Sequence, residues 1–245
     1  MQRTISAMVG KGSVNHNSRK FRAENVDGTR THLNIDYCNE NIKTVYHELF
    51  DEALERYNAK QIRSDRKIKD YYEKIRSSKQ EKPFHEIILQ VGGKGNMNAD
   101  TENGELAKQI LDEYYQGFQE RNPQLRVFSA HLHMDEATPH LHIDFVPFTT
   151  GSKRGLDTRV SLKQALATQG FKGGSRGDTE WSQWIQSEKE QLAGNRFDSV
   201  NHIQLGIGQV VYNNCFMACA QQFHNGMASD ISCTAGNKNS HLFSS

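Results

Sequence analysis

The sequence predicts an α/β fold of the α+β kind, in which an antiparallel sheet is flanked by helices. Short β-rich apolar runs alternate with longer segments that lack Pro and Gly and carry apolar side chains at helical spacing. Two of the apolar runs directly flank one short turn, which predicts a hairpin and therefore antiparallel pairing. A length of 245 residues suits one domain with a small appendage or two small domains.

The first third of the chain contains two predicted strands and a long helical segment. Residues 4–9 have the composition of a buried strand, and the polar, Gly-containing segment 11–30 predicts a loop with a helical turn. Residues 31–37 alternate in polarity, which indicates a further strand. Residues 42–78 lack Pro and Gly and have helical spacing, so we expect one long helix or two stacked helices.

The middle of the chain alternates between β-rich and helical patterns. We expect strands at 84–91, 125–133 and 140–147, helices at 103–120, 160–168 and 179–193, and a basic loop at 151–155. Helices of this length between strands are typical of helices layered on a sheet.

The composition changes near residue 197, so we expect a domain at 1–196 and an atypical tail at 197–245. The tail holds only three charged side chains, and its helix propensity is low. We interpret it as out of frame or disordered. The alternative is a small zinc module, although its spacing matches no standard zinc pattern. Its ligands would be Cys215, Cys219, Cys233 and His224.

Cysteine usage and hydropathy favour the cytoplasm. Cys38 is the only cysteine in the first 196 residues, which argues against a disulfide framework. No apolar stretch approaches the roughly 20 residues that cross a bilayer, and the apolar run at 5–9 is too short for a signal peptide.

The net charge of +1 does not by itself indicate nucleic acid, but the charges are unevenly distributed. Residues 1–30 carry six Lys or Arg against two acids, and residues 60–82 carry nine against four. Such patches fit a phosphate-binding surface, and for the second patch a solvated helical face is the alternative.

Three histidines and a glutamate between residues 133 and 142 predict a metal site. His140 and His142 are two residues apart, so they share one face of a strand. A chain that folds back through 134–139 brings His133 level with them and places Glu136 at the turn. Three imidazoles then converge as ligands of a divalent metal with positions left open. His131 shares the strand face of His133 and is the alternative ligand.

Two further constellations lie near the N-terminus. His16 and Arg19 stand three residues apart in a basic loop, and a nucleophile beside a guanidinium suits attack on a phosphate. An ordinary surface loop is the alternative. His32, Asn34 and Asp36 would share one face of the strand predicted at 31–37, which an ordinary polar sheet edge also explains.

Taken together, these three segments resemble the MobV (Mob/Pre) relaxases, a family of plasmid mobilisation and recombination enzymes. The family motifs H-N-x-R, H-L-N-x-[DE] and H-x-D-E-x-x-P-H-x-H correspond here to segments 16–19, 32–36 and 133–142. The resemblance extends over about residues 1–195, including 174–181, and stops at the tail. It implies an HUH-endonuclease-like fold, an antiparallel sheet that carries the histidines and is flanked by helices.

The resemblance also implies a function in bacterial cytoplasm. The activity is site- and strand-specific nicking of plasmid DNA at an origin of transfer, with covalent attachment to the 5′ end and later religation. The implied metal is Mn²⁺ or Mg²⁺, held by His133, His140 and His142. His16 is the implied nucleophile, and Arg19 would orient the phosphate. Glu136 would complete the metal shell, orient a ligand or act as base, and Asp135 would support the turn.

Several cations and one amide are expected to contact single-stranded or hairpin origin DNA. These residues are Arg22, Arg30, Asn34, Lys153, Arg154, Arg159 and Arg176. Family members usually continue into a long helical region for dimerisation and membrane association. We therefore expect any homodimer to need such a C-terminal region, which the 245 residues do not include. No small-molecule cofactor is expected.

Two rival functions remain open. One is a DNA-binding remnant of a relaxase without catalysis. The other is a replication initiator nuclease that uses a tyrosine, for which the candidates are Tyr37, Tyr71, Tyr72, Tyr114 and Tyr115.

Overall fold

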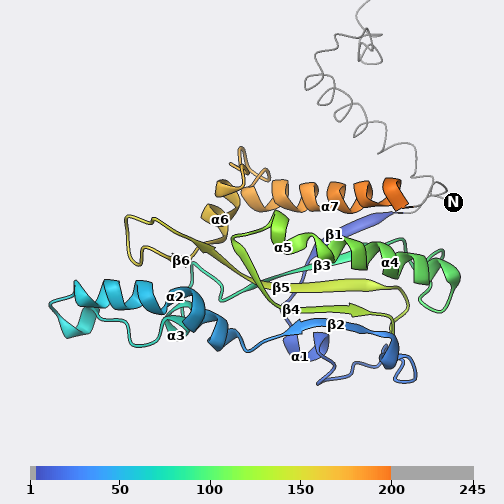
Figure 1. Ribbon diagram of the computed structural model, residues 1–245, viewed down its shortest axis with the longest axis horizontal. Coiled ribbons are helices and arrows are strands. Elements are labelled where there is room, and N and C mark those ends of the chain that lie inside the picture. The colour runs from blue at the N-terminus through green and yellow to red at the C-terminus, as the bar shows by residue number, and fades with distance from the viewer. Residues whose placement is uncertain (1–3, 200–245) are drawn as a thin grey trace, which may run out of the picture. The chain divides into compact units, whose positions relative to one another are not determined.

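An antiparallel sheet forms the centre of the structure, a computed structural model that describes residues 4–199 (Figure 1). Its strand order is β1-β3-β5-β4-β2, and β6 pairs with the end of β5. The strands are β1 Ile5–Val9, β2 Ile35–Asn39, β3 His85–Val91, β4 Leu125–His133, β5 His140–Thr149 and β6 Arg159–Val160. The predicted α+β class with an antiparallel sheet is confirmed.

Several helices begin at a residue whose side chain caps the first turn. Asn41, Thr101 and Ser161 each accept a hydrogen bond from a backbone N–H of the first turn that follows. The helices are α1 Val14–Asn17, α2 Ile42–Ala59, α3 Tyr71–Arg76, α4 Glu102–Gln116, α5 Phe118–Arg121, α6 Leu162–Thr168 and α7 Glu180–Ser199. Two 3-10 turns, η1 Thr31–Leu33 and η2 Ser64–Arg66, complete the described elements.

One face of the sheet is apolar and is covered by α4, α5, α6 and α7 (Figure 1). Alternate residues of β5, namely Leu141, Ile143 and Phe145, are fully buried in the main core together with Trp184 of α7. This burial follows from the period of two in a strand, which sends every second side chain to the same face.

The opposite face is divided along the strands. At one end, Val146 of β5 and Phe128 of β4 join a second core beneath α2 and α3. At the other end, the same face carries His140, His142 and Asp144. The polar end of this face is therefore the place where function-bearing side chains gather.

The observed elements depart from the sequence-based prediction at a few points. The strand expected at 31–37 begins only at Ile35, because Leu33 and Asn34 donate backbone hydrogen bonds three residues back and form η1. The segment 42–78 is divided into α2, η2 and α3, and the helix expected at 103–120 is interrupted at Gly117. The two-residue strand β6 was not predicted.

The expected tail falls almost entirely outside the described residues. Helix α7 reaches Ser199, and residues 200–245 are not described, so the zinc alternative built on Cys215, Cys219, Cys233 and His224 lies outside them. Among residues 4–199, no helix is both long enough and apolar enough to cross a membrane.

Candidate active site and metal centre

The β4–β5 hairpin brings the three predicted metal ligands to one place. His133 pairs directly with His140, and His131 pairs with His142 on the same face. Leu141, between the two β5 histidines, points to the opposite face and is fully buried in the main core. The folding back of the chain through 134–139 is therefore confirmed.

In each of the three imidazole rings, one nitrogen makes a hydrogen bond to an oxygen of the protein, and this bond holds the ring. Nε2 of His133 lies 2.8 Å from the main-chain oxygen of Asn17, and Nδ1 of His140 lies 2.8 Å from that of Thr138. Nδ1 of His142 lies 2.6 Å from Oε1 of Glu86. Because these oxygens accept hydrogen bonds, each ring carries its proton on the anchored nitrogen and keeps a lone pair on the other.

The three remaining nitrogens fit a divalent metal. Nδ1 of His133 and Nε2 of His140 are 3.4 Å apart, and ligand atoms of all three histidines lie within 4.8 Å of one another. Nε2 of His142 is buried and has no hydrogen-bond partner, which is unfavourable unless a further group binds there. Neutral imidazoles are common ligands of divalent first-row transition metals.

Burial keeps the rings of His133 and His140 neutral. It lowers the pKa of His133 to about 2, and the neighbouring histidines act in the same direction. Burial and His142 also lower the pKa of His140. Since only the neutral ring offers a lone pair to a metal, the site is prepared for a cation at neutral pH.

A buried polar network that the sequence did not reveal lies behind the histidines. The side-chain amide of Asn17 donates to Oε1 of Glu86 at 2.8 Å and to Oδ2 of Asp144 at 3.0 Å. Asp144 also accepts from Ser129, and Glu86 accepts from the backbone of Gly12. Burial, together with the charge of Glu86, raises the pKa of Asp144 to about 7. Glu86 lies on the face of β3 opposite Ile87 and Leu89, where a polar residue is ordinary, so the sequence pattern carried no signal for it.

Arg19 is fixed against the turn between β4 and β5. Its Nε donates to Oδ2 of Asp135 at 2.9 Å, and its Nη2 donates to Oδ1 of Asp135 and to Oε1 of Glu136. Among the described residues other than glycine, Arg19 alone has a positive φ, of 56°. The ion pair between Arg19 and Asp135, with its two hydrogen bonds, holds this strained backbone in place.

His16 stands beside the three metal-ligand candidates. Its ring centre is 6.1 Å from that of His133 and 6.2 Å from that of His142. Its Nε2 is 3.5 Å from Oε1 of Glu136. Burial and the positive charge of Arg19 lower the pKa of His16, so its ring is neutral at neutral pH.

Glu136 faces both parts of the site. The same oxygen that approaches His16 lies 3.7 Å from Nε2 of His140 and 4.0 Å from Nδ1 of His133. Its other oxygen accepts from the side-chain amide of Asn25 at 2.7 Å. The sequence segments around residues 16 and 136 therefore meet in space, as the predicted site requires.

Two residues expected to contact DNA have structural contacts at the same turn. Asn34 accepts from the backbone N–H of Met134 at 2.7 Å and donates to Asp135 at 2.8 Å. Arg30 donates to the main-chain oxygen of Met134. The expected row of His32, Asn34 and Asp36 on one strand face is wrong, because His32 lies in η1 and its Nδ1 contacts the main-chain oxygen of Thr29.

Three of the other expected DNA contacts lie at the far end of β5, away from the histidines. The loop of Lys153 and Arg154 follows the far end of β5, about 30 Å from His140 for a strand of this length. Arg159 pairs with Thr149 at that same end. Arg176 is exposed in the loop before α7, and Arg22 is exposed just after Arg19. The structure does not bring these side chains to one phosphate.

The alternatives weighed from the sequence are less well placed. His131 is fully buried and its Nδ1 contacts Asp36 at 2.6 Å, while the cluster with a metal-like spacing consists of the other three histidines. A pocket of about 370 Å³ opens beside them, and no tyrosine of the described residues lines it. Tyr114 is instead buried in the main core, and Tyr71 in the second core.

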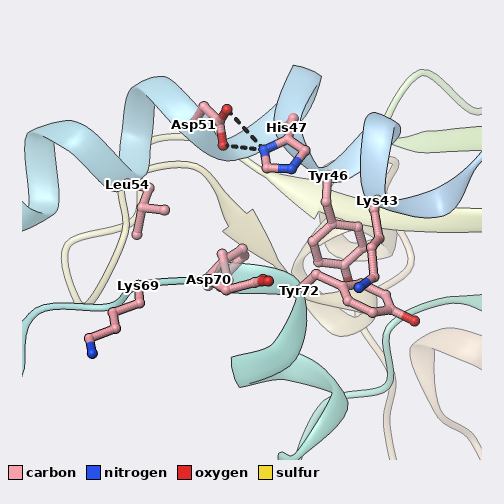
Figure 2. Close-up of a pocket in the computed structure, with 9 residues that line it drawn as sticks. Lys43, Tyr46, His47, Asp51, Leu54, Lys69, Asp70 and Tyr72 are labelled. Carbon is pink, nitrogen blue, oxygen red and sulfur yellow. Dashed lines mark hydrogen bonds and ion pairs between the residues drawn. The ribbon is translucent and has the colours of Figure 1, made fainter.

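A second pocket of about 280 Å³ lies between α2 and the start of α3 (Figure 2). Its charges are largely paired: His47 contacts both carboxylate oxygens of Asp51 at 3.0 Å, and Lys43 approaches Glu73 at 3.5 Å. None of its lining residues belongs to the three sequence motifs, so we place the functional site at the histidines.

Fold and site together define a class of α+β protein. Its antiparallel sheet carries three histidines with metal-like spacing, and a fourth histidine approaches them from a short N-terminal helix. The model of the Mob_Pre family of plasmid recombination enzymes matches residues 12–172, and the chain belongs to this family.

Two relatives and two solved structures are similar to the chain. The plasmid recombination enzymes type 3 of Staphylococcus aureus and of Mammaliicoccus lentus are 28% identical to it over 157 residues, which are 62% of this chain and 33% of each relative. The chain thus matches about a third of their length. The Mn-bound MobM relaxase domain with plasmid pMV158 oriT DNA is 17% identical in a crystal at pH 5.5, where 88% of this chain and all of that one are covered, with a TM-score of 0.46. In a crystal at pH 4.6 the values are 19%, 85% and 91%, with a TM-score of 0.48.

Proposed function

We propose that the chain is a plasmid mobilisation relaxase that nicks one strand of DNA at an origin of transfer. The observation that carries the proposal is the position of His16, a neutral imidazole next to three further imidazoles whose free nitrogens converge. Membership of the plasmid recombination enzyme family supports the same conclusion.

The reaction is a transfer of the phosphoryl group from a 3′ oxygen to His16. A nitrogen of the imidazole forms a bond to phosphorus while the bond between phosphorus and the 3′ oxygen breaks. The leaving oxygen takes a proton from solvent and becomes a 3′ hydroxyl, and the 5′ phosphate stays on His16 as a phosphoramidate. Reversal of these steps religates the strand.

The surrounding side chains prepare this step. The carboxylate of Glu136, 3.5 Å from Nε2 of His16, stabilises the positive charge that grows on the ring. Arg19, fixed by Asp135, supplies positive charge for the phosphate oxygens. His133, His140 and His142 would hold Mn²⁺ or Mg²⁺, which when bound neutralises charge on the phosphate.

The proposal is tested by trapping the covalent complex. The protein is incubated with Mn²⁺ and end-labelled single-stranded DNA from the origin of transfer next to its gene, and a complex that survives denaturation is sought. We expect such a complex, with the adduct located on His16 by mass spectrometry. His16→Ala should lose the complex and keep DNA binding.

The matched control is His47→Ala, which removes an exposed histidine of α2 and should leave the complex unchanged. A complex formed at the normal rate by His16→Ala would show that another residue is the nucleophile. DNA that is bound but left uncut with Mn²⁺ or Mg²⁺ would instead identify a DNA-binding protein without catalysis.

A further inference from the structure

The sheet surface beside the histidines has an unusual composition. On β1 and β3, the side chains that share the face of the histidines include Met8, Ile88 and Gln90. Met8 is 47% exposed, although it is a large apolar side chain on a paired strand. All three residues line the pocket of about 370 Å³.

Strand register fixes how close this surface is to the metal-ligand candidates. Ile88 pairs directly with His142, and Gln90 pairs directly with His140. Directly paired residues on one face of an antiparallel sheet have Cβ atoms about 5 Å apart. Met8 pairs with Ile88 on the side away from the histidines, so the apolar surface continues outward from the site.

The two halves of this sheet face differ in what covers them. Helix α1 contacts β4, where Asn17 binds His133, so the half around β4 is covered. The half formed by β1 and β3 forms the floor of the pocket, whose remaining lining includes His16 and Thr138. Met8 and Ile88 give this floor an apolar surface beside the proposed phosphate-transfer site, and the uncharged face of a nucleobase can pack on such a surface.

Gln90 gives this floor one directed polar group. Its Nε2 uses one N–H to donate to the main-chain oxygen of Gly92 at 2.8 Å, which holds the amide, and Oε1 is the acceptor of this amide. Gly92 has a φ of 71°, so the turn that places this oxygen favours glycine. An acceptor at this position matches the exocyclic amino group of cytosine or adenine, whereas thymine presents an acceptor there.

We propose that Met8, Ile88 and Gln90 form a subsite for one unpaired base next to the scissile phosphate, with Gln90 favouring an amino-bearing base over thymine. The proposal rests on the proposed relaxase function and adds a substrate determinant to it. Its occupant is single-stranded DNA, because a base within a duplex is stacked on both faces and cannot lie on the sheet.

Binding of labelled (dC)20 and (dT)20 by fluorescence anisotropy tests the subsite, in EDTA so that no strand is cut. We expect the wild-type protein to bind (dC)20 about threefold or more tighter than (dT)20, as one hydrogen bond allows. Gln90→Met should remove this difference. Met8→Ser should weaken both oligonucleotides by about threefold or more, and needs no repacking because Met8 is half exposed.

Ile62→Ser is the matched control, because Ile62 is fully exposed and lies outside the pocket. It should bind both oligonucleotides as the wild type does. Equal affinities of the wild type for the two oligonucleotides, or an unchanged Met8→Ser variant, would overturn the subsite. The covalent-complex assay separates the two proposals. If an adduct is trapped but Met8→Ser binds DNA as the wild type does, only the subsite is wrong. If the oligonucleotides bind as expected but no adduct forms, only the nicking activity is wrong.

Discussion

The main-chain oxygen of Asn17 accepts a hydrogen bond from Nε2 of His133 over 2.8 Å, although the two residues are 116 positions apart. The side chain of Asn17 at the same time joins Glu86 to Asp144. One residue of α1 thus sets the protonated nitrogen of a metal-ligand candidate and separates two buried carboxyl groups. Since His16 precedes it directly, the same contacts fix the position of the proposed nucleophile.

Asn17→Ala should lower the stability of the fold. The substitution keeps the main-chain oxygen but removes the amide, so Glu86 and Asp144 each lose a buried donor and face one another without a bridge. We expect the free energy of unfolding to fall by about 2–3 kcal/mol, as for buried hydrogen bonds to charged groups. Urea unfolding measures it. Asn15→Ala, at an exposed position of the same helix, should change it little, and an equal loss in both variants would contradict this role.

Glu86→Gln should weaken metal binding without removing a ligand. The carboxylate accepts the Nδ1 proton of His142 and thereby makes Nε2 more basic, whereas a neutral amide does so less. We expect the affinity for Mn²⁺, measured by calorimetric titration, to fall by about 10- to 100-fold. Glu113→Gln, an exposed position of α4, is the control. Unchanged affinity in Glu86→Gln would show that His142 needs no partner carboxylate.

Arg19→Lys should impair the reaction although it keeps the charge. Lysine cannot form the two parallel hydrogen bonds that fix Arg19 on Asp135, so the cation loses its orientation toward the phosphate. We expect the rate of covalent-complex formation to fall by about tenfold or more. Arg56→Lys is a close control, because Arg56 makes the same two-pronged contact with Asp157 on the surface. Equal rates in wild type and Arg19→Lys would mean that charge alone suffices.

The metal-ligand candidates could be grouped from the sequence because their relationship is local. His140 and His142 share a face by the period of a strand, and a six-residue turn brings His133 opposite His140. The pairing of β3 with β5 joins residues 50 to 60 positions apart, and no pattern within either segment specifies the register. No sequence pattern therefore connects Glu86 with His142, although its carboxylate holds that ring.

The turn residues show a second limit of sequence patterns. Residues 31–37 alternate like a strand, yet local hydrogen bonds form η1, and Asn34 turns to the hairpin. Arg30 and Asn34 were assigned to DNA by charge and polarity, which do not distinguish a phosphate from a main-chain oxygen of the protein itself. Their contacts in the structure support the turn, and their contact with DNA stays a prediction.

Asp135→Asn should destabilise the protein in a way that depends on pH. Burial raises the pKa of Asp135, but the hydrogen bonds and charge of Arg19 and the hydrogen bond of Asn34 outweigh it and lower the pKa to about 2, from an ordinary value of 3.8. A carboxyl whose pKa is lower in the folded protein stabilises it above the unfolded-state pKa, and this contribution is lost as the pH falls toward the folded-state value. The shift corresponds to about 2 kcal/mol at pH 7.

The comparison of wild type and Asp135→Asn by urea unfolding at several pH values checks this linkage. The difference in unfolding free energy should be nearly constant from pH 7 to about pH 4, and should shrink to about half near pH 3. Asp65→Asn offers a control, since Asp65 pairs with Arg63 on the exposed surface and should show a small difference throughout. A difference that stays the same from pH 7 down to pH 3 would mean that Asp135 titrates like an ordinary carboxyl group, and that the ion pair with Arg19 does not hold the turn on which Glu136 and the histidines depend.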